Sequence, residues 1–221
     1  MVNEQWTIPK RVRDKLNNEM IDTIIFDLGG VLIDWNPHHL YNKIFEDEAR
    51  KAYFFENICT SDWNEEQDAG RPIQAATEML VAQHPGWEQE IRAFYGRWQE
   101  MLGGPIQGTV EILEELKTAG QHRLYALTNW SAETFPVALD MYDFLHWFEG
   151  IVVSGVEKTR KPFPEFYKIL FERYAIVPER ALFIDDNQRN VVGARELGLH
   201  CVHFQSPEQL GTYLKNAGIL T

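Results

Sequence analysis

The chain has 221 residues, which is enough for one full hydrophobic core and a second, smaller unit. Its 33 acidic residues outnumber its 21 basic residues, and the resulting net charge of −12 opposes binding to nucleic acid or to an anionic membrane. No apolar run approaches the roughly 20 residues of a transmembrane helix, and the first twenty residues are too polar for a signal peptide. We therefore expect a soluble, cytoplasmic protein that binds neither nucleic acid nor membranes.

The first strongly apolar segment, residues 23–35 (TIIFDLGGVLIDW), follows a polar stretch with one possible amphipathic turn at residues 12–20. The segment predicts a buried strand that ends at Asp27 and then turns at Gly29 and Gly30. In α/β folds the carboxyl ends of such strands open toward a ligand crevice, so Asp27 is a candidate functional acid. The pattern also fits an acid that only closes a turn by accepting hydrogen bonds from nearby backbone amides.

Residues 36–104 differ from the rest of the chain, because they are rich in Glu, Gln, Ala and aromatic residues and contain no convincing strand pattern. We predict that they form an all-helical domain inserted after the first motif. Its tryptophans are expected to pack in the core of a helical bundle rather than to bind substrate. These residues are Trp35, Trp63, Trp87 and Trp98.

From residue 105 onward, segments with a strand pattern alternate with segments with a helix pattern, which predicts parallel βαβ units. Residues 1–35 and 105–221 are therefore expected to form a Rossmann-like α/β core with a parallel sheet. The predicted strands after residue 105 are 123–128, 150–155, 181–186 and 200–204.

Polar side chains stand at the ends of three predicted strands, namely Asp27, Thr128 and the pair Asp185 and Asp186, and Lys161 lies in a loop after a fourth strand. Because the carboxyl ends of parallel strands share one edge of a sheet, these residues can converge on one crevice. Three charged acids need compensation there. Mg²⁺ provides it, since this ion prefers carboxylate, carbonyl and water oxygens and a substrate phosphate. Each residue taken alone also fits a helix cap, a strand end or a solvated loop charge.

The motifs that carry these residues, IIFDLGG, LYALTNW, the Lys-Pro pair at 161–162 and LFIDDN, resemble those of the haloacid dehalogenase superfamily. The resemblance covers residues 23 to about 204 and includes a helical cap inserted after the first motif. It implies a strand-end aspartate that is phosphorylated by a phosphate substrate and then hydrolysed.

The resemblance implies a Mg²⁺ site in the first and last motifs. Asp27 would be both the nucleophile and a metal ligand. The carbonyl of Gly29 and the carboxylate of Asp186 would bind Mg²⁺ as well, and Asp185 would support the metal site.

The resemblance also implies a phosphate site. Thr128 would hold a phosphoryl oxygen, and Lys161 would bridge the nucleophile and the phosphate. Asn129 is expected beside the substrate or, like Asn190, among the groups that support the site.

One position departs from the pattern of the superfamily. Its phosphatases usually carry an aspartate two residues after the nucleophile, which protonates the leaving oxygen and later activates water, but this chain has Gly29. Such proton transfer is worth about 10² to 10⁴ in rate. Some sugar-phosphate phosphatases of the superfamily that act on anomeric phosphates, such as α-glucose 1-phosphate, also have glycine there, and the chain resembles that branch. His38 and His39 follow closely enough to act as substitutes, although they also fit exposed histidines without a catalytic role.

The function expected from these features is a Mg²⁺-dependent phosphatase that hydrolyses a small phosphorylated metabolite, such as a sugar phosphate, through an aspartyl phosphate. A 2-haloacid dehalogenase is one alternative, although the fourth motif of those enzymes lacks the paired acids found at residues 185–186. The other alternative is a binding or regulatory protein of the same fold that has lost turnover through Gly29. The expected oligomeric state is a monomer or a homodimer.

Overall fold

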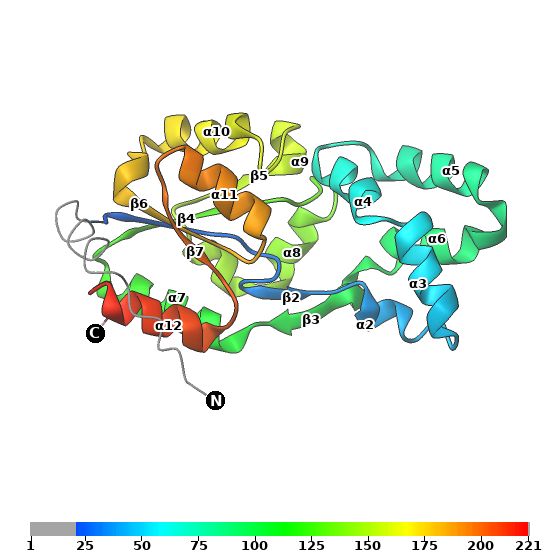
Figure 1. Cartoon of the computed structure of the whole chain (residues 1–221), viewed down its shortest axis with the longest axis horizontal. Helices are drawn as coiled ribbons and strands as arrows, with labels where there is room; N and C mark the ends of the chain where they lie inside the picture. Colours follow the sequence, from blue (N-terminus) through cyan, green and yellow to red (C-terminus); the bar gives the residue numbers. More distant parts are fainter. Residues whose placement is uncertain (1–20, 221) are drawn as a thin grey trace.

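A central parallel sheet of five strands organises the computed structural model, which describes residues 21–220 (Figure 1). The strand order is β5-β4-β1-β6-β7, and each neighbouring pair is parallel. The strands are β1 (Thr23–Phe26), β4 (Arg123–Thr128), β5 (Gly150–Val153), β6 (Ala181–Asp185) and β7 (His200–His203). This order places β1 between β4 and β6, so the predicted α/β fold with a parallel sheet is confirmed.

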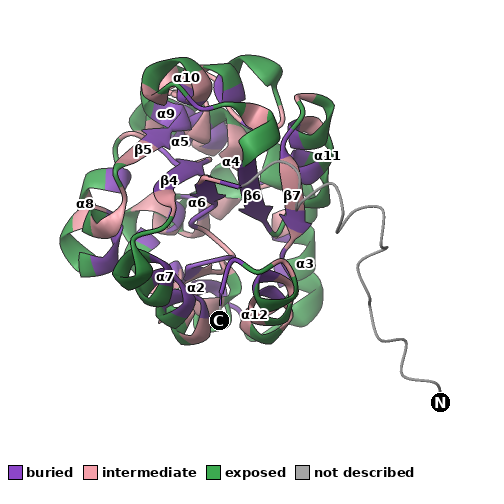
Figure 2. Ribbon diagram, turned by 90° about the vertical axis from the view of Figure 1, so that its left-hand side faces the viewer, coloured by how far each residue is buried: buried purple, intermediate pink, exposed green. Residues whose placement is uncertain are grey.

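Helices cover both faces of this sheet because the strands are apolar on both sides. Ile24 and Phe26 of β1 pack against one layer, which includes α7 (Gln107–Ala119), α8 (Phe135–Met141) and α12 (Pro207–Asn216). Ile25 points to the opposite layer, which is built from α10 (Pro164–Tyr174) and α11 (Gln188–Glu196). Figure 2 shows the consequence: the central strands β4 and β6 are buried, and the outer surfaces of the helices are exposed.

The remaining elements of this half of the molecule are short. They are η3 (Asp143–Trp147), α9 (Ser154–Glu157) and η4 (Pro178–Arg180).

A second group of helices lies beyond the carboxyl edge of the sheet and has its own hydrophobic core (Figure 1). It contains α2 (His38–Tyr41), α3 (Glu48–Asn57), α4 (Ser61–Asp68), α5 (Ile73–Gln83), η1 (Pro85–Trp87), α6 (Glu88–Gly96) and η2 (Trp98–Met101). Two of these helices begin at side-chain caps. Asp47 accepts hydrogen bonds from the backbone amides of Ala49 and Arg50, and Thr60 accepts one from Trp63. We call this group of helices, residues 38–101, the cap.

Two short strands connect the sheet to the cap. β2 (Ile33–Trp35) and β3 (Leu102–Pro105) pair antiparallel, so both crossings of the chain run side by side. The sequence did not predict β3, because its Gly103 and Gly104 weaken any strand pattern. Gly103 is nevertheless needed where it lies: a Cβ there would come within 2.7 Å of the carboxyl carbon of Asp34.

Two further expectations from the sequence concern membrane-spanning helices and the segment at residues 12–20. Every helix within residues 21–220 is too short or too polar to cross a membrane. The possible amphipathic turn at residues 12–20 lies outside the described residues.

Candidate active site

Asp27 directly follows β1 at the carboxyl edge of the sheet. Its backbone amide continues the ladder by donating to the carbonyl of Ile184 at 2.8 Å. Its Oδ1 accepts a hydrogen bond from the amide of Leu28 at 2.7 Å, and its side chain is only 10% exposed. The strand and the turn therefore fix the carboxylate at a site that is almost closed to bulk water.

Lys161 bridges two carboxylates at this edge. Its Nζ lies 2.8 Å from Oδ2 of Asp27 and 2.7 Å from Oδ2 of Asp185, and its side chain is fully buried. Burial alone would lower the pKa of this ammonium, but the charges of Asp185 and Asp27 raise it above its usual value. Lys161 is therefore charged and positioned by two acids.

Asn129, which follows β4, holds the backbone of the lysine. Its Oδ1 accepts from the amide of Lys161 at 2.8 Å, and its Nδ2 donates to the carbonyl of Lys161 at 3.1 Å. Both ends of its side-chain amide are occupied in this way. Asn129 lines the cavity described below, but its amide group positions Lys161.

Asp185, the last residue of β6, is the most tightly held of the three acids. Its Oδ1 accepts from the amide of Asn187 at 2.8 Å, and Nδ2 of Asn190 lies 3.1 Å from both of its oxygens. Together with Lys161, these donors occupy both carboxylate oxygens. Asp185 therefore fixes the lysine, and Asn190 supports Asp185.

Asp186 is exposed and turns toward the first glycine turn. One carboxylate oxygen from each of Asp27, Asp185 and Asp186 lies within 4.8 Å of the others. Burial raises the pKa of the Asp27 carboxyl well above its usual range. The charge of Lys161 lowers this pKa, and the charges of Asp185 and Asp186 raise it. The partial burial of its carboxyl and the charge of Asp185 also raise the pKa of Asp186. One lysine thus does not balance the three acids, and the donor set fits a divalent cation.

Thr128 ends β4 on the same edge of the sheet. Its side chain is 1% exposed, and its Oγ1 has no hydrogen-bond partner among the described residues. A buried hydroxyl without a partner costs about 1–3 kcal/mol. This hydroxyl is therefore available to a ligand oxygen.

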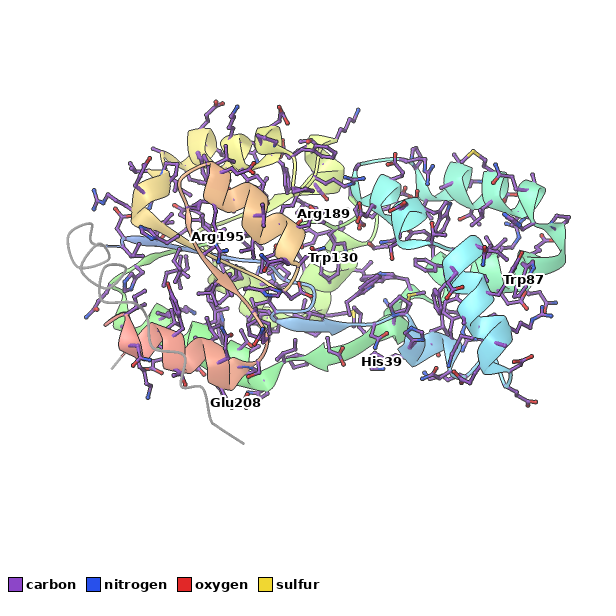
Figure 3. The ribbon with its side chains drawn as sticks, in the orientation of Figure 1. His39, Trp87, Trp130, Arg189, Arg195 and Glu208 are labelled. Carbon is purple, nitrogen blue, oxygen red and sulfur yellow. The ribbon has the colours of Figure 1, made fainter. Side chains whose placement is uncertain are left out.

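A cavity of about 290 Å³ opens between this edge and the cap. Its core wall includes Asp27, Gly29, Gly30, Asn129, Trp130, Ser131, Thr134, Asp186, Asn187 and Asn190. Its remaining wall is formed by Trp35, Ser61, Asn64, Glu65, Asp68, Tyr95 and Trp98. Figure 3 shows Trp130 and Arg189 on the side of the core that faces the cap.

Helix α4 supplies the polar part of the cap wall. Ser61, Asn64, Glu65 and Asp68 are spaced three and four residues apart, so they share one face of the helix. Glu65 is paired with two cations of the core: its Oε2 lies 3.1 Å from Arg160, and its Oε1 contacts Arg189. The polar face of α4 is thus held against the core.

Asp68 is the last residue of that face. Its Oδ2 accepts a hydrogen bond from Nδ2 of Asn64 at 3.2 Å, and Oδ1 of Asn64 accepts one from the hydroxyl of Tyr95 at 2.9 Å. Burial, reinforced by Glu65, raises the pKa of the Asp68 carboxyl to about 7, against the opposing effect of Arg160. This cap carboxyl is therefore poised to exchange a proton near neutral pH.

The histidines after the first motif lie away from the cavity. His39 contacts Asp34 at 2.8 Å beside the β2 and β3 connection (Figure 3). His38 is exposed and packs against Phe55. Neither histidine lines the cavity. Their suggested role as substitutes for the missing acid is therefore not supported by their positions.

The tryptophans divide between two environments. Trp63 and Trp87 pack in the hydrophobic core of the cap, as predicted. Trp98 packs against the larger core and Trp35 lies on β2, and both line the cavity. The prediction that all four belong to a bundle core was therefore wrong for these two.

Sequence reasoning brought Asp27, Thr128, Lys161, Asp185 and Asp186 to one edge, and the structure places them there. It missed the cavity wall contributed by Tyr95, Trp130 and α4. The only sequence signal for α4 was its polar stripe, which in a helix normally indicates a solvent-exposed face.

Comparisons with known proteins show what this chain is similar to. A family model described as haloacid dehalogenase-like hydrolase matches residues 21–198. The sesquiterpene phosphatase astK of Aspergillus oryzae is 28% identical over 81% of this chain and 87% of its own length. The phosphorylated carbohydrates phosphatase of Thermotoga maritima is 23% identical over 83% of this chain and 84% of its own.

A solved structure shows the shared fold. It is that of a haloacid dehalogenase family enzyme from Bacteroides thetaiotaomicron, in complex with magnesium and inorganic phosphate. The two chains are 24% identical, with a TM-score of 0.65 over 84% of this chain and 95% of that one.

Proposed function

The chain belongs to the haloacid dehalogenase-like hydrolases, and we propose that it is a Mg²⁺-dependent phosphatase that hydrolyses a small phosphorylated metabolite through an aspartyl phosphate on Asp27. The observation that carries the proposal is the contact of the Lys161 ammonium with both Asp27 and Asp185. The site around it has unbalanced acids and a Thr128 hydroxyl that has no partner among residues 21–220. A phosphate monoester supplies what this site lacks, namely oxygens for the hydroxyl and for the cation.

In this mechanism a carboxylate oxygen of Asp27 attacks phosphorus, and the bond between phosphorus and the leaving oxygen breaks. Lys161 offsets the repulsion between the carboxylate and the phosphate, and the Thr128 hydroxyl donates to a phosphoryl oxygen. Mg²⁺, held by Asp27, Asp186 and the carbonyl of Gly29, would neutralise charge on the phosphoryl oxygens. Water then attacks the phosphorus of the aspartyl phosphate, and the carboxylate of Asp27 is restored.

The size of the cavity favours a substrate with a small leaving group. Its volume of about 290 Å³ is at the lower end of the usual range for ligand pockets. The polar face of α4 offers partners for hydroxyl groups, which supports a sugar phosphate. The rings of Trp35, Tyr95, Trp98 and Trp130 offer apolar contact instead, and they favour a second candidate, a terpenyl phosphate such as the name of the Aspergillus relative suggests.

The first experiment measures release of p-nitrophenol from its phosphate, with Mg²⁺ and with excess EDTA. We expect turnover that chelation abolishes and that Asp27→Asn removes while leaving the circular dichroism spectrum unchanged. Beryllium fluoride should protect the wild type from unfolding but not Asp27→Asn. Undiminished turnover in EDTA, or in Asp27→Asn, would contradict the proposal.

The same preparation separates the remaining alternatives. Release of halide from 2-chloropropionate without Mg²⁺ would indicate a dehalogenase, and phosphate binding without turnover would indicate a binding protein. Comparison of kcat/KM for α-glucose 1-phosphate and for farnesyl phosphate then distinguishes the two classes of leaving group.

A further inference from the structure

The site as described has a nucleophile but no acid in the turn that follows it. Gly29 occupies the position at which an acid would reach the leaving oxygen, and it lines the cavity without a side chain. Departure of an alcohol from phosphorus needs a proton, and supply of that proton is worth about 10² to 10⁴ in rate. We therefore expect another group on the cavity wall to supply the proton.

Asp68 is held on the opposite wall of that cavity by donors from both halves of the molecule. Asn64 donates to its carboxylate from within α4, and the backbone amide of Ser131 donates from the loop after β4. Its carbonyl accepts from the hydroxyl of Ser154. These contacts fix the carboxyl on the cap wall of the cavity that Asp27 also lines.

The charged groups around Asp68 leave it free to carry a proton. Glu65, the other cap carboxyl on this wall, is paired with Arg160 and Arg189. Among residues 21–220, Asp68 takes part in no ion pair, although Arg160 and Lys161 act on it at a distance. Tyr95 is the remaining titratable neighbour, and burial raises the pKa of its hydroxyl far above the neutral range.

We propose that Asp68 is the catalytic acid that protonates the leaving oxygen and the base that then activates water, in place of an acid at position 29. The role rests on the proposed phosphatase function. As the bond from phosphorus to the leaving oxygen breaks, that oxygen takes the proton of the Asp68 carboxyl and departs as an alcohol. The Asp68 carboxylate then accepts a proton from water, the water oxygen bonds to phosphorus, and the bond from phosphorus to Asp27 breaks. A pKa of about 7 suits both halves of this cycle.

The test compares kcat/KM for p-nitrophenyl phosphate and for n-butyl phosphate in the wild type and in Asp68→Asn. Nitrophenolate leaves without a proton, whereas butoxide does not. We expect Asp68→Asn to lose about 10² to 10⁴ in kcat/KM on the butyl ester and little on the aryl ester. In the wild type, activity on the butyl ester should fall as the pH rises through about 7, and the variant should lack this decline.

Two further variants make the result specific. Glu65→Gln makes the same change of carboxylate to amide on the same helix face, and any loss it causes should be equal for the two esters. Gly29→Asp in the Asp68→Asn background should restore activity on the butyl ester, because position 29 has room: among residues 21–220, an added Cβ would meet only Cβ of Trp35, at 3.9 Å.

Pre-steady-state kinetics tests the second half of the role. With the aryl ester, Asp68→Asn should release about one nitrophenolate per enzyme in a burst before slower turnover, because water is no longer activated. Equal losses on both esters, or no loss on the butyl ester, would overturn the assignment to Asp68 while leaving the phosphatase intact. Absence of turnover in the wild type on either ester would overturn both proposals.

Discussion

Gly30 lies directly beneath the carboxylate of Asp186: a Cβ added to Gly30 would be 2.6 Å from the carboxyl carbon of Asp186. Gly30 also has a φ of +74°, a conformation that costs other residues about 1–2 kcal/mol. We therefore expect Gly30→Ala to displace Asp186 and to weaken Mg²⁺ binding at least tenfold, as measured by calorimetric titration. Gly29→Ala is the matched control and should bind Mg²⁺ normally, because Gly29 has space and no positive φ. Equal affinities in the two variants would contradict this view of the turn.

The buried lysine is expected to dominate the stability of the site. Lys161→Met leaves Asp27 and Asp185 facing each other without a cation, and loss of one partner of a buried ion pair costs about 3–5 kcal/mol. Urea unfolding near pH 7 measures this loss. In the double variant Lys161→Met, Asp185→Asn, one of the two charges is gone, so the loss should be smaller than the sum of the two single losses.

Thr128 provides a test that separates ligand binding from folding. Thr128→Val replaces a hydroxyl that has no partner within the described residues by a methyl group of the same shape. We expect stability to stay the same or to rise by about 1 kcal/mol, and turnover to fall about tenfold or more as the donor to the phosphoryl oxygen is lost. Thr128→Ser keeps the donor and should retain most of the activity. A fully active Thr128→Val would remove the hydroxyl from the mechanism.

The sequence predicted the edge of the sheet better than the cavity above it. Asp27, Thr128 and Asp185 could be placed together because each ends a strand, and the carboxyl ends of parallel strands meet at one edge. The roles within that edge were harder to predict. Asn129 was expected either beside the substrate or among the supporting groups, and the structure shows its amide group bound to the backbone of Lys161. Which of two nearby partners a side chain binds depends on side-chain geometry. The spacing of residues in the sequence does not specify that geometry.

The cap, too, was predicted only in part from the sequence. Its helical nature followed from composition and from breaks in the chain, but the face that it turns to the core did not. Asp68 and Asn64 belong to a polar stripe that would look identical on a solvent-exposed helix. Only the position of α4 against the core turns this stripe into a cavity wall.

The ion pairs between the cap and the core are expected to control opening of the cap. Glu65 is the junction, since it binds both Arg160 and Arg189 of the core. Glu65→Gln should weaken this contact and increase hydrogen exchange in α4 and in the connecting strands β2 and β3, and a phosphate analogue should restore part of the protection. Glu66→Gln is the matched control, because Glu66 is more exposed and lies 3.6 Å from Arg160. Equal exchange in the two variants would show that the ion pairs of Glu65 do not hold the cap closed.

The stability of the protein should report the titration of Asp68 without any substrate. The pKa of its carboxyl is raised from 3.8 to about 7 in the folded protein, so the folded state favours the protonated form. The stabilisation from this group is complete below the unfolded pKa and is lost as the pH rises through about 7. Asp68→Asn keeps an acceptor for Asn64 and Ser131 and carries no charge, so it lacks this loss. Relative to the wild type, the variant should gain stability between about pH 4 and pH 8, by at most about 1.4 kcal/mol for each unit of the pKa shift. Urea unfolding of both proteins across this range measures the gain, and a difference that does not change with pH would show that the folded pKa of Asp68 is not raised.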